Sequence, residues 1–390
     1  MSYQATLLQD STAPHISDPK ATIDYHQVRK IIPVAPRQPV AKLKQLAADA
    51  AAEPGALVVD KPEELLGAGV ELTKHNGELQ ICSRIKGFPT RLDNQIGILD
   101  HHIIEGDVNF HTNNLECEGD LMIKGSIMAG FRVRAKNLTV HGNIENAKVE
   151  CCGNITCFGG IVACQDVPLV CHGSLWCKYL ENSLIEVHGN IFIAKSSLHS
   201  FLKAGENVIL CTPDSVLVGG RCESGQSLYT ASLGAKWATP TEIILGCNPF
   251  LAQELSTVQG ELAALELEMS ELQERIEQIN TFLRQQEENQ ASSGEIHQLQ
   301  EERELNEGKI GILGTRQLEL KDRCSRLEKQ IAAHKAAVDD IGLEISSHLF
   351  SGIQLTIKDT ETRILEETGA VKLKLNPENN DEIVAVIEKS

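Results

Sequence analysis

The sequence predicts a mainly β fold, in which a parallel β-helix carries an inserted long antiparallel α-helical coiled-coil hairpin. Three observations favour it: a phrase of glycine and a small polar residue recurs within residues 76–247, an apolar heptad series occupies residues 248–347, and strand-like runs return within residues 348–390. Aromatic residues make up only 4% of the 390 residues. The interior must therefore come from stacked layers of aliphatic side chains and cysteine rather than from large rings.

Residues 1–75 are predicted to be an irregular N-terminal arm or a small subdomain, because prolines interrupt the segment repeatedly. A helix-like patch is expected around residues 40–52, and the run Leu57-Val58-Val59 is expected to form one strand. No residue pattern in this segment suggests catalysis.

The repeated phrase predicts a parallel β-helix over residues 76–247. Glycine with a small polar residue suits a tight bend with positive φ, and a short β-prone run follows each bend. One unit cannot bury its own apolar face, so each strand is expected to pair in parallel with its equivalent one turn later. Asn76-Gly77 is the one clear hairpin signal, which disfavours an antiparallel sandwich. The copies are Glu105-Gly106-Asp107-Val108, Glu118-Gly119-Asp120-Leu121, His141-Gly142-Asn143-Ile144, Cys152-Gly153-Asn154-Ile155, His172-Gly173-Ser174-Leu175 and His188-Gly189-Asn190-Ile191.

The heptad series predicts two paired helices within residues 248–347. From Leu251 to Leu283 apolar residues alternate at spacings of four and three, and a second series runs from Ile310 to Ile345. Polar residues 289–294 separate the two series, so the seams must pair antiparallel to be hidden from water. At 1.5 Å per residue the first arm is roughly 50 Å long and the second is somewhat longer, so the hairpin is expected to reach beyond a compact domain.

Several polar or flexible residues interrupt the second helix. Gly308, Gly311 and Gly314 each cost up to about 1 kcal/mol relative to alanine, which predicts a bend or a frayed joint. Gln317 and His334 place polar groups in the seam, where they are expected to weaken packing and either to fix the register or to mark a solvated kink. The strands within 348–390 need a sheet edge, so they are expected to return to the β-helix and cap its end.

The order of the glycine phrases, and of the exit into the helices, is distinctive. The phrases are Glu105-Gly106-Asp107-Val108, Gly119-Asp120-Leu121-Met122-Ile123, Val140-His141-Gly142-Asn143-Ile144, Gly159-Gly160-Ile161, Val218-Gly219-Gly220 and Gly246-Cys247-Asn248-Pro249. Over residues 75–375 this order resembles the flagellar assembly protein A family. The resemblance implies a right-handed β-helix scaffold that acts in flagellar assembly or cell-pole organisation through protein contacts, with no enzymatic activity and no cofactor.

Charge and targeting patterns narrow the class of partner. The formal net charge is −18, and no Lys/Arg run is dense enough to follow a phosphate backbone, which disfavours nucleic acid and anionic membrane. Protein partners are expected instead, including further copies of the chain in a homo-oligomer. The sequence shows no signal-peptide pattern and no membrane-spanning apolar run, which predicts a cytoplasmic protein. Its twelve cysteines are then expected to be reduced and mostly buried as small hydrophobes.

Scattered carboxylates and glycine pairs offer little support for catalysis. A polysaccharide-cleaving β-helix needs clustered carboxylates, whereas the candidate aspartates occur singly and two of them occupy phrase corners, where a turn role suits them. The glycine pairs precede neither a helix nor a Lys-Ser/Thr pair, which favours a tight corner over a phosphate loop. These residues are Asp107, Asp120, Asp166, Asp214, Gly159-Gly160 and Gly219-Gly220.

Histidines suggest two possible metal sites. His141, His172 and His188 occupy the same place in three phrases, so they could stack as a metal-binding ladder. A second possible cluster comprises His101-His102, His111 and Cys117. No Cys-x-x-Cys pair supports zinc, and a single repeated histidine lacks a full ligand set. An exposed corner that tolerates histidine is therefore the favoured interpretation.

The sequence thus predicts a non-enzymatic cytoplasmic scaffold or regulatory protein, with no catalytic, cofactor-binding or metal-binding residue and with partner-binding residues that the sequence does not assign. Two alternatives stay open. One is a carbohydrate-binding or carbohydrate-processing β-helix. The other is a self-assembling cytoskeletal scaffold whose uncapped ends stack, whereas caps at both ends would give discrete oligomers.

Overall fold

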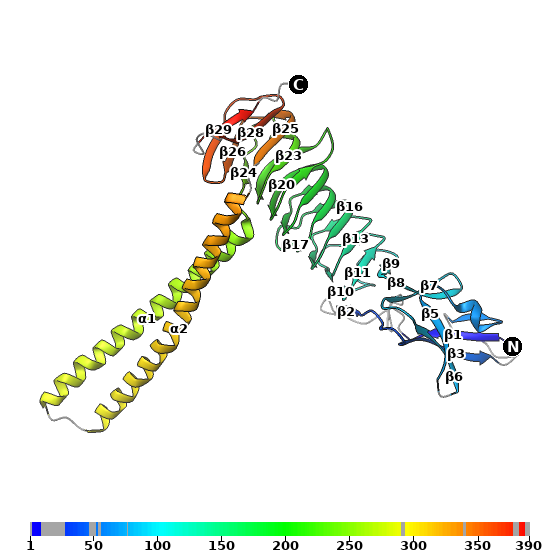
Figure 1. The fold of residues 1–390 in the computed structure, drawn as a ribbon, viewed down its shortest axis with the longest axis horizontal. Coiled ribbons are helices and arrows are strands. Elements are labelled where there is room, and N and C mark those ends of the chain that lie inside the picture. The colour runs from blue at the N-terminus through cyan, green and yellow to red at the C-terminus, as the bar shows by residue number, and fades with distance from the viewer. Residues whose placement is uncertain are drawn as a thin grey trace. The chain divides into compact units, whose positions relative to one another are not determined.

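The computed structural model describes residues 2–8, 28–46, 52–53, 56–75, 77–289, 293–337, 341–376 and 382–386. The chain divides into two compact units, both drawn in Figure 1. A β unit comprises Met1–Leu245 and Ile341–Ser390, and a helical unit comprises Gly246–Asp340. The helical unit is therefore an insertion between two segments of one β unit.

A five-stranded antiparallel sheet begins the β unit, in the order β4-β1-β3-β6-β5. Its strands are β1 (Ser2–Leu7), β3 (Pro39–Leu46), β4 (Leu57–Val59), β5 (Val70–His75) and β6 (Glu78–Ser83), with a 3₁₀ helix, η1 (Pro62–Leu65), between β4 and β5. β7 (Phe88–Leu92) and β8 (Gln95–Leu99) form a separate hairpin. Gly77, with φ of 87°, lies in the β5–β6 turn, so the predicted hairpin is confirmed, although Asn76 itself lies outside the described residues.

Apart from β2 (Val28–Ile31), the described strands of residues 1–75 lie, together with β6, in a small sheet that has its own core. The helix predicted around residues 40–52 is wrong where the chain is described, because β3 occupies its first part. Lys42 and Lys44 are exposed while Ala41 and Leu43 are buried, which is the two-residue period of a strand. β3 pairs with β1 and β6, and this pairing outweighs local helix propensity. The strand predicted at Leu57–Val59 is confirmed as β4.

The remainder of the β unit is a parallel β-solenoid, as predicted (Figure 1). Its strands pair in three parallel stacks, which form three sides of each turn. The ionic side, named for ion pairs described below, contains β2 (Val28–Ile31), β10 (Asn114–Cys117), β12 (Arg132–Ala135), β15 (Lys148–Cys151), β17 (Leu169–Cys171), β19 (Leu184–Val187), the last parts of β20 (Ile191–Ala204) and β22 (Val216–Ser224), and β24 (Thr241–Leu245). The N-terminal segment therefore supplies, as β2, a strand of the first turn.

Two further sides complete each turn. The aromatic side contains β9 (His101–Ile104), β11 (Asp120–Ile123), β13 (Leu138–Val140), the first parts of β16 (Ile155–Val162), β18 (Leu175–Glu181) and β20, then β21 (Val208–Leu210) and β23 (Leu228–Leu233). The short side contains β14 (Ile144–Glu145) and the remaining parts of β16, β18, β20, β22 and β23.

Inward side chains stack in columns along the solenoid. On the aromatic side one column runs through Leu121, Leu138, Ile155, Leu175 and Ile191, each at most 2% exposed. Cysteine fills other inward positions, where it behaves as a small apolar residue. All twelve cysteines are free and nine are buried, so the predicted burial is confirmed.

The corner glycines show why the phrase repeats. Positive φ was predicted for them, but none of the six phrase glycines has one. Instead a Cβ at Gly189 would lie 2.8 Å from the carbonyl oxygen of Gly173 one turn earlier, and a Cβ at Gly142 would lie 2.8 Å from the backbone of Gly125. At corners such as these, glycine is therefore needed because successive turns approach closely, and not because the chain bends into the left-handed region; Gly106, in the first phrase, is the exception, since a Cβ there would meet no atom within 4 Å.

A polar residue at each corner between the ionic and aromatic sides joins one turn to the next. The Oδ1 atom of Asn137 accepts a hydrogen bond from the backbone N–H of Asn154 at 2.8 Å, and that of Asn154 accepts one from Ser174 at 2.8 Å. In the same way, the backbone N–H of Asn190 donates to Ser174 Oγ at 3.2 Å, and the backbone N–H of Asn207 donates to Asn190 Oδ1 at 3.0 Å. This ladder satisfies corner N–H groups that would otherwise lack a partner. Its partners are 16 to 20 residues apart, which explains the irregular repeat.

The C-terminal strands finish the solenoid and then reverse. β25 (Gly342–Leu349) and β26 (Ile353–Ile357) add parallel strands to β23 and β24. β27 (Thr360–Ile364) then pairs antiparallel with β26, β28 (Val371–Leu375) with β25, and β29 (Ile383–Val386) with β28. These antiparallel strands occupy the sheet edge that a further parallel turn would need.

The helical unit consists of α1 (Pro249–Asn289) and α2 (Ser293–Ala337), which pair antiparallel. Arg323 bonds Glu254 at 2.7 Å and Arg275 bonds Glu302 at 2.8 Å, so early residues of α1 face late residues of α2. Apolar side chains from both helices form a buried seam, as the heptads predicted; they are Val258, Leu265, Leu320, Cys324 and Leu327.

Three details of the predicted helices change. α2 is described to Ala337, and Ile341 precedes β25 while Ile345 lies within it, so their placement in the second heptad series was wrong. Their side chains are buried in the β unit, where parallel pairing with β23 replaces helix formation. α2 continues without interruption through Gly308, Gly311 and Gly314, so the predicted frayed joint is absent. Gln317 donates a hydrogen bond to Glu266 of α1 at 2.9 Å, which satisfies its amide at the helix interface.

Candidate interaction faces of the solenoid

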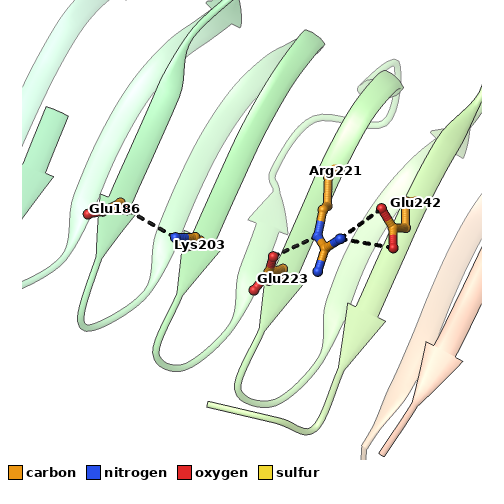
Figure 2. Close-up of polar contacts among 5 residues, drawn as sticks. All are labelled: Glu186, Lys203, Arg221, Glu223 and Glu242. Carbon is orange, nitrogen blue, oxygen red and sulfur yellow. Dashed lines mark hydrogen bonds and ion pairs between the residues drawn. The ribbon is translucent and has the colours of Figure 1, made fainter. Parts of the chain in front are cut away.

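The outward side chains of the ionic side form ion pairs between turns. Lys203 Nζ lies 3.1 Å from Glu186 Oε1 on the preceding turn, and Arg221 lies between Glu223 at 2.6 Å and Glu242 at 3.1 Å (Figure 2). The pairs of Lys203 with Glu186 and of Arg221 with Glu242 join neighbouring turns, because parallel strands bring equivalent positions side by side, whereas Glu223 lies on the same strand as Arg221. Every charge in this group has an opposite charge beside it.

The same arrangement recurs nearer the N-terminal end of the solenoid. Arg134 lies 3.0 Å from Glu150 and 3.9 Å from Glu116, on the turns either side of it. Half-exposed pairs of this kind contribute only about 0–1 kcal/mol each. Their main effect is that the ionic side largely cancels its own charge, despite a net charge of −18 for the chain. Sequence reasoning missed this ladder, although partners such as Glu186 and Lys203, 17 residues apart, are one turn apart.

The aromatic side carries a column of large, mostly apolar outward residues. Trp176, Phe192, Ile209 and Tyr229 occupy equivalent positions on successive turns and are all half-buried. Phe158, which is 50% exposed, packs against Trp176 with ring centroids 5.7 Å apart. No charged side chain interrupts this column from Met122 to Tyr229. It was not anticipated, because the aromatic residues are few and separated in sequence by whole turns.

The structure brings together two of the three predicted stacking histidines. His172 and His188 occupy the corner between the ionic and aromatic sides on successive turns, with their Nδ1 atoms 3.0 Å apart and their rings stacked at 4.6 Å. Burial, and then the nearby His172, hold the pKa of His188 below its usual value. His141 lies at the other corner, between the aromatic and short sides, and its ring packs 5.1 Å from that of Phe158. The three-histidine ladder, which the sequence disfavoured, is therefore not formed, because each turn has two glycine corners and the phrases do not all mark the same one. All three histidines are exposed, as the favoured interpretation of an exposed corner expects.

The second predicted cluster is not assembled. His101 contacts Asp100 at 2.6 Å, and His102 points inward, with its ring 5.7 Å from that of Phe88. Burial lowers the pKa of His102 to about 4, so it is neutral at physiological pH. His111 is exposed, and Cys117 is buried on the ionic side. Within the described residues, no three side chains of His, Cys, Asp or Glu come together as metal ligands would.

The aspartates and the glycine pairs have structural roles. Asp107 Oδ1 accepts the backbone N–H of Ser126 at 2.7 Å, and Asp120 Oδ1 accepts the amide of Asn137 at 2.8 Å, as the turn role predicts. Asp166 and Asp214 are exposed in separate loops.

The two glycine pairs serve close packing and backbone geometry. A Cβ at Gly160 would collide with the ring of Tyr179, so close packing favours glycine at this position. Gly219 and Gly220 have φ of 69° and 81°, within the strand that turns a corner. Neither pair forms a phosphate loop, since each lies within a β-strand.

Thiol burial leads to a chemical prediction. Burial raises the pKa of Cys157 and Cys222 to about 12, whereas Cys152 and Cys211 are exposed. Because the thiolate is the reactive form, iodoacetamide should label Cys152 and Cys211 in the native protein and should reach Cys157 and Cys222 only after unfolding. Peptide mass spectrometry after brief labelling, with and without urea, measures this. Equal labelling of Cys222 and Cys152 in the native state would contradict the buried arrangement.

In the described part of the chain, neither long helix combines the length and apolar character needed to cross a membrane. No curated protein and no solved structure matches the chain. A family model described as the Flagellar Assembly Protein A beta solenoid domain matches residues 100–383. That match spans the solenoid from β9 onward, the inserted helices and the C-terminal strands as far as β28. The solenoid and the inserted helices are present in both the sequence pattern and the structure, and the family model matches most of the chain. The chain therefore belongs to the flagellar assembly protein A family.

Proposed function

We propose that the protein is a non-enzymatic cytoplasmic scaffold or regulatory protein that acts through protein–protein contacts, in bacterial flagellar assembly or cell-pole organisation. Membership of the flagellar assembly protein A family supports the process. The aromatic side supports the mode of action, because its column of half-exposed rings is held on a rigid parallel sheet. A rigid surface loses little conformational entropy on binding, and Trp and Tyr contribute strongly to protein interfaces.

The aromatic side is the proposed docking face for an apolar surface of a partner protein. The ionic side is the weaker candidate, because its charges already pair with one another, as for Arg221 with Glu223 and Glu242. A partner that displaced these pairs would need to desolvate and re-pair them. The aromatic column needs no such exchange, since its outward residues from Met122 to Tyr229 carry no charge.

A discrete homo-oligomer is the proposed assembly state. The antiparallel strands β27, β28 and β29 occupy the C-terminal sheet edge, which disfavours end-to-end stacking into filaments. Light scattering should then give a small multiple of the 42.6 kDa chain mass. Long filaments in negative-stain micrographs would contradict this.

A carbohydrate-binding role is the second candidate, because aromatic rings in a row also stack on sugar rings. Processing of a carbohydrate has less support, since no carboxylate projects from the column between Met122 and Tyr229. Binding to polysaccharide beads by the native protein, lost on replacing Trp176, would favour this candidate over a protein partner.

The full chain tests the proposal through matched substitutions. Thr139 and Thr156 already occupy the outward column, so Trp176→Thr with Tyr229→Thr keeps a residue type that the solenoid accepts. Phe201→Thr, at a 53% exposed aromatic residue of the ionic side, is the control. Each variant replaces the native protein in the bacterium, and flagella per cell and proteins crosslinked to the variant are counted.

In the double variant, the amount of one crosslinked partner protein is expected to fall at least tenfold, and the number of flagella per cell is expected to fall. Phe201→Thr should change neither quantity. Equal crosslinking by all variants would remove the aromatic side as the docking face. Normal flagella in cells lacking the protein altogether would instead overturn the proposed process.

A further inference from the structure

The His172–His188 pair has the geometry of two ligands to one ion. Their Nδ1 atoms lie 3.0 Å apart on adjacent turns. Imidazole nitrogens bind zinc at about 2.0–2.1 Å, so two of them on one ion lie about 2.9 Å apart at a right angle and about 3.4 Å apart at a tetrahedral angle. The observed separation falls within this range, so an ion could be bound with little movement of either ring.

The backbone holds the two histidines in this relation. The N–H of His188 donates to the carbonyl oxygen of Cys171, and the N–H of His172 donates to that of Cys151, both at 2.9 Å. The glycine after each histidine continues the same ladder, with Gly189 N–H bonded to Gly173 at 2.9 Å. Because the strands leading into both corners are paired in register, the backbone preorganises the two histidines.

The surroundings leave room for the rest of a coordination sphere. Both histidines are exposed, so water can supply the remaining ligands. No third His, Cys, Asp or Glu joins them as a ligand group in the part of the chain that the structure describes. An open site with two imidazoles suits metals that prefer imidazole nitrogen, and not calcium or magnesium, which prefer oxygen.

We propose that His172 and His188 form a surface site for one divalent transition-metal ion of the zinc, nickel or copper(II) class, bound by both Nδ1 atoms and completed by water. The site stands on the corner between the ionic and aromatic sides. It is independent of the proposed docking role, because it requires only the two histidines and the register of their strands.

Nickel binding to the full chain tests the site. Exposed thiols are first alkylated with iodoacetamide in every sample, so that Cys152 and Cys211 do not compete for metal. Isothermal titration with Ni²⁺ at neutral pH then compares the native protein with His172→Ala, His188→Ala and the double variant. Two ligands on one rigid surface act as a chelate. Each single variant is therefore expected to lower the Ni²⁺ affinity of the tightest site at least tenfold, and the double variant should lower it little further.

His141→Ala is the matched control, because His141 occupies the same place in a glycine phrase but lies at the other corner. It should bind Ni²⁺ as the native protein does. The Cu²⁺ electron paramagnetic resonance spectrum should show coupling to two imidazole nitrogens in the native protein and to fewer in His188→Ala. Equal Ni²⁺ affinity of the native protein and the double variant would overturn the proposal, as would equal loss in His141→Ala.

Discussion

Leu138→Ala is expected to lower the free energy of unfolding of the β unit by about 2–5 kcal/mol, the range for large-to-small substitutions in a packed core. Leu138 is 1% exposed and pairs with Leu121 on one side and Ile155 on the other. The neighbours of Leu138 in this inward column are held in place by parallel backbone ladders. They cannot move inward to fill the space, so the cavity should remain.

Tryptophan fluorescence in urea measures this loss within the β unit alone. Both tryptophans, Trp176 and Trp237, belong to that unit, so unfolding of the helices does not contribute to the signal. Leu365→Ala removes the same atoms from a residue that is 75% exposed and should change the free energy by less than about 0.5 kcal/mol. Equal shifts of the urea midpoint for the two variants would show that Leu138 is not in a close-packed core.

The fold class could be predicted from sequence because each solenoid turn repeats its own local pattern. The glycine phrases mark corners, and apolar residues such as Leu121, Ile155 and Ile191 follow the corner between the ionic and aromatic sides. The two heptad series likewise predicted α1 and α2, because their seam depends only on spacing within each helix. Features of this kind need no knowledge of which residues meet across turns.

Features that depend on contacts between turns could not be read in the same way. His141 and His172 share a phrase but occupy different corners, since two corners per turn have similar sequences. The ion pairs of Arg221 and the column through Trp176 become visible only when strands are placed in register. Ile345 fits a heptad spacing, yet its place in β25 is decided by pairing with Thr230 of β23, more than a hundred residues earlier.

Replacing glycine with alanine should change the stability of the β unit differently at two corner glycines. A Cβ at Gly205 would collide with the carbonyl oxygen of His188 and would lie 2.9 Å from its carbonyl carbon, both of them backbone atoms one turn earlier. Because a paired strand cannot shift as a side chain can, Gly205→Ala should destabilise the β unit by about 1–3 kcal/mol. The same fluorescence measurement in urea reports the change.

Gly106→Ala is the matched variant, since Gly106 lies in the first of the glycine phrases and a Cβ there would meet no atom within 4 Å. Neither glycine has a positive φ, so backbone strain is the same small factor in both. With no collision, alanine at position 106 restricts the unfolded chain and should leave stability unchanged or raise it by up to about 1 kcal/mol. If both variants were destabilised equally, the glycines would be required by chain geometry and not by the close approach of successive turns, and the physical reason given for the repeated phrase would be wrong.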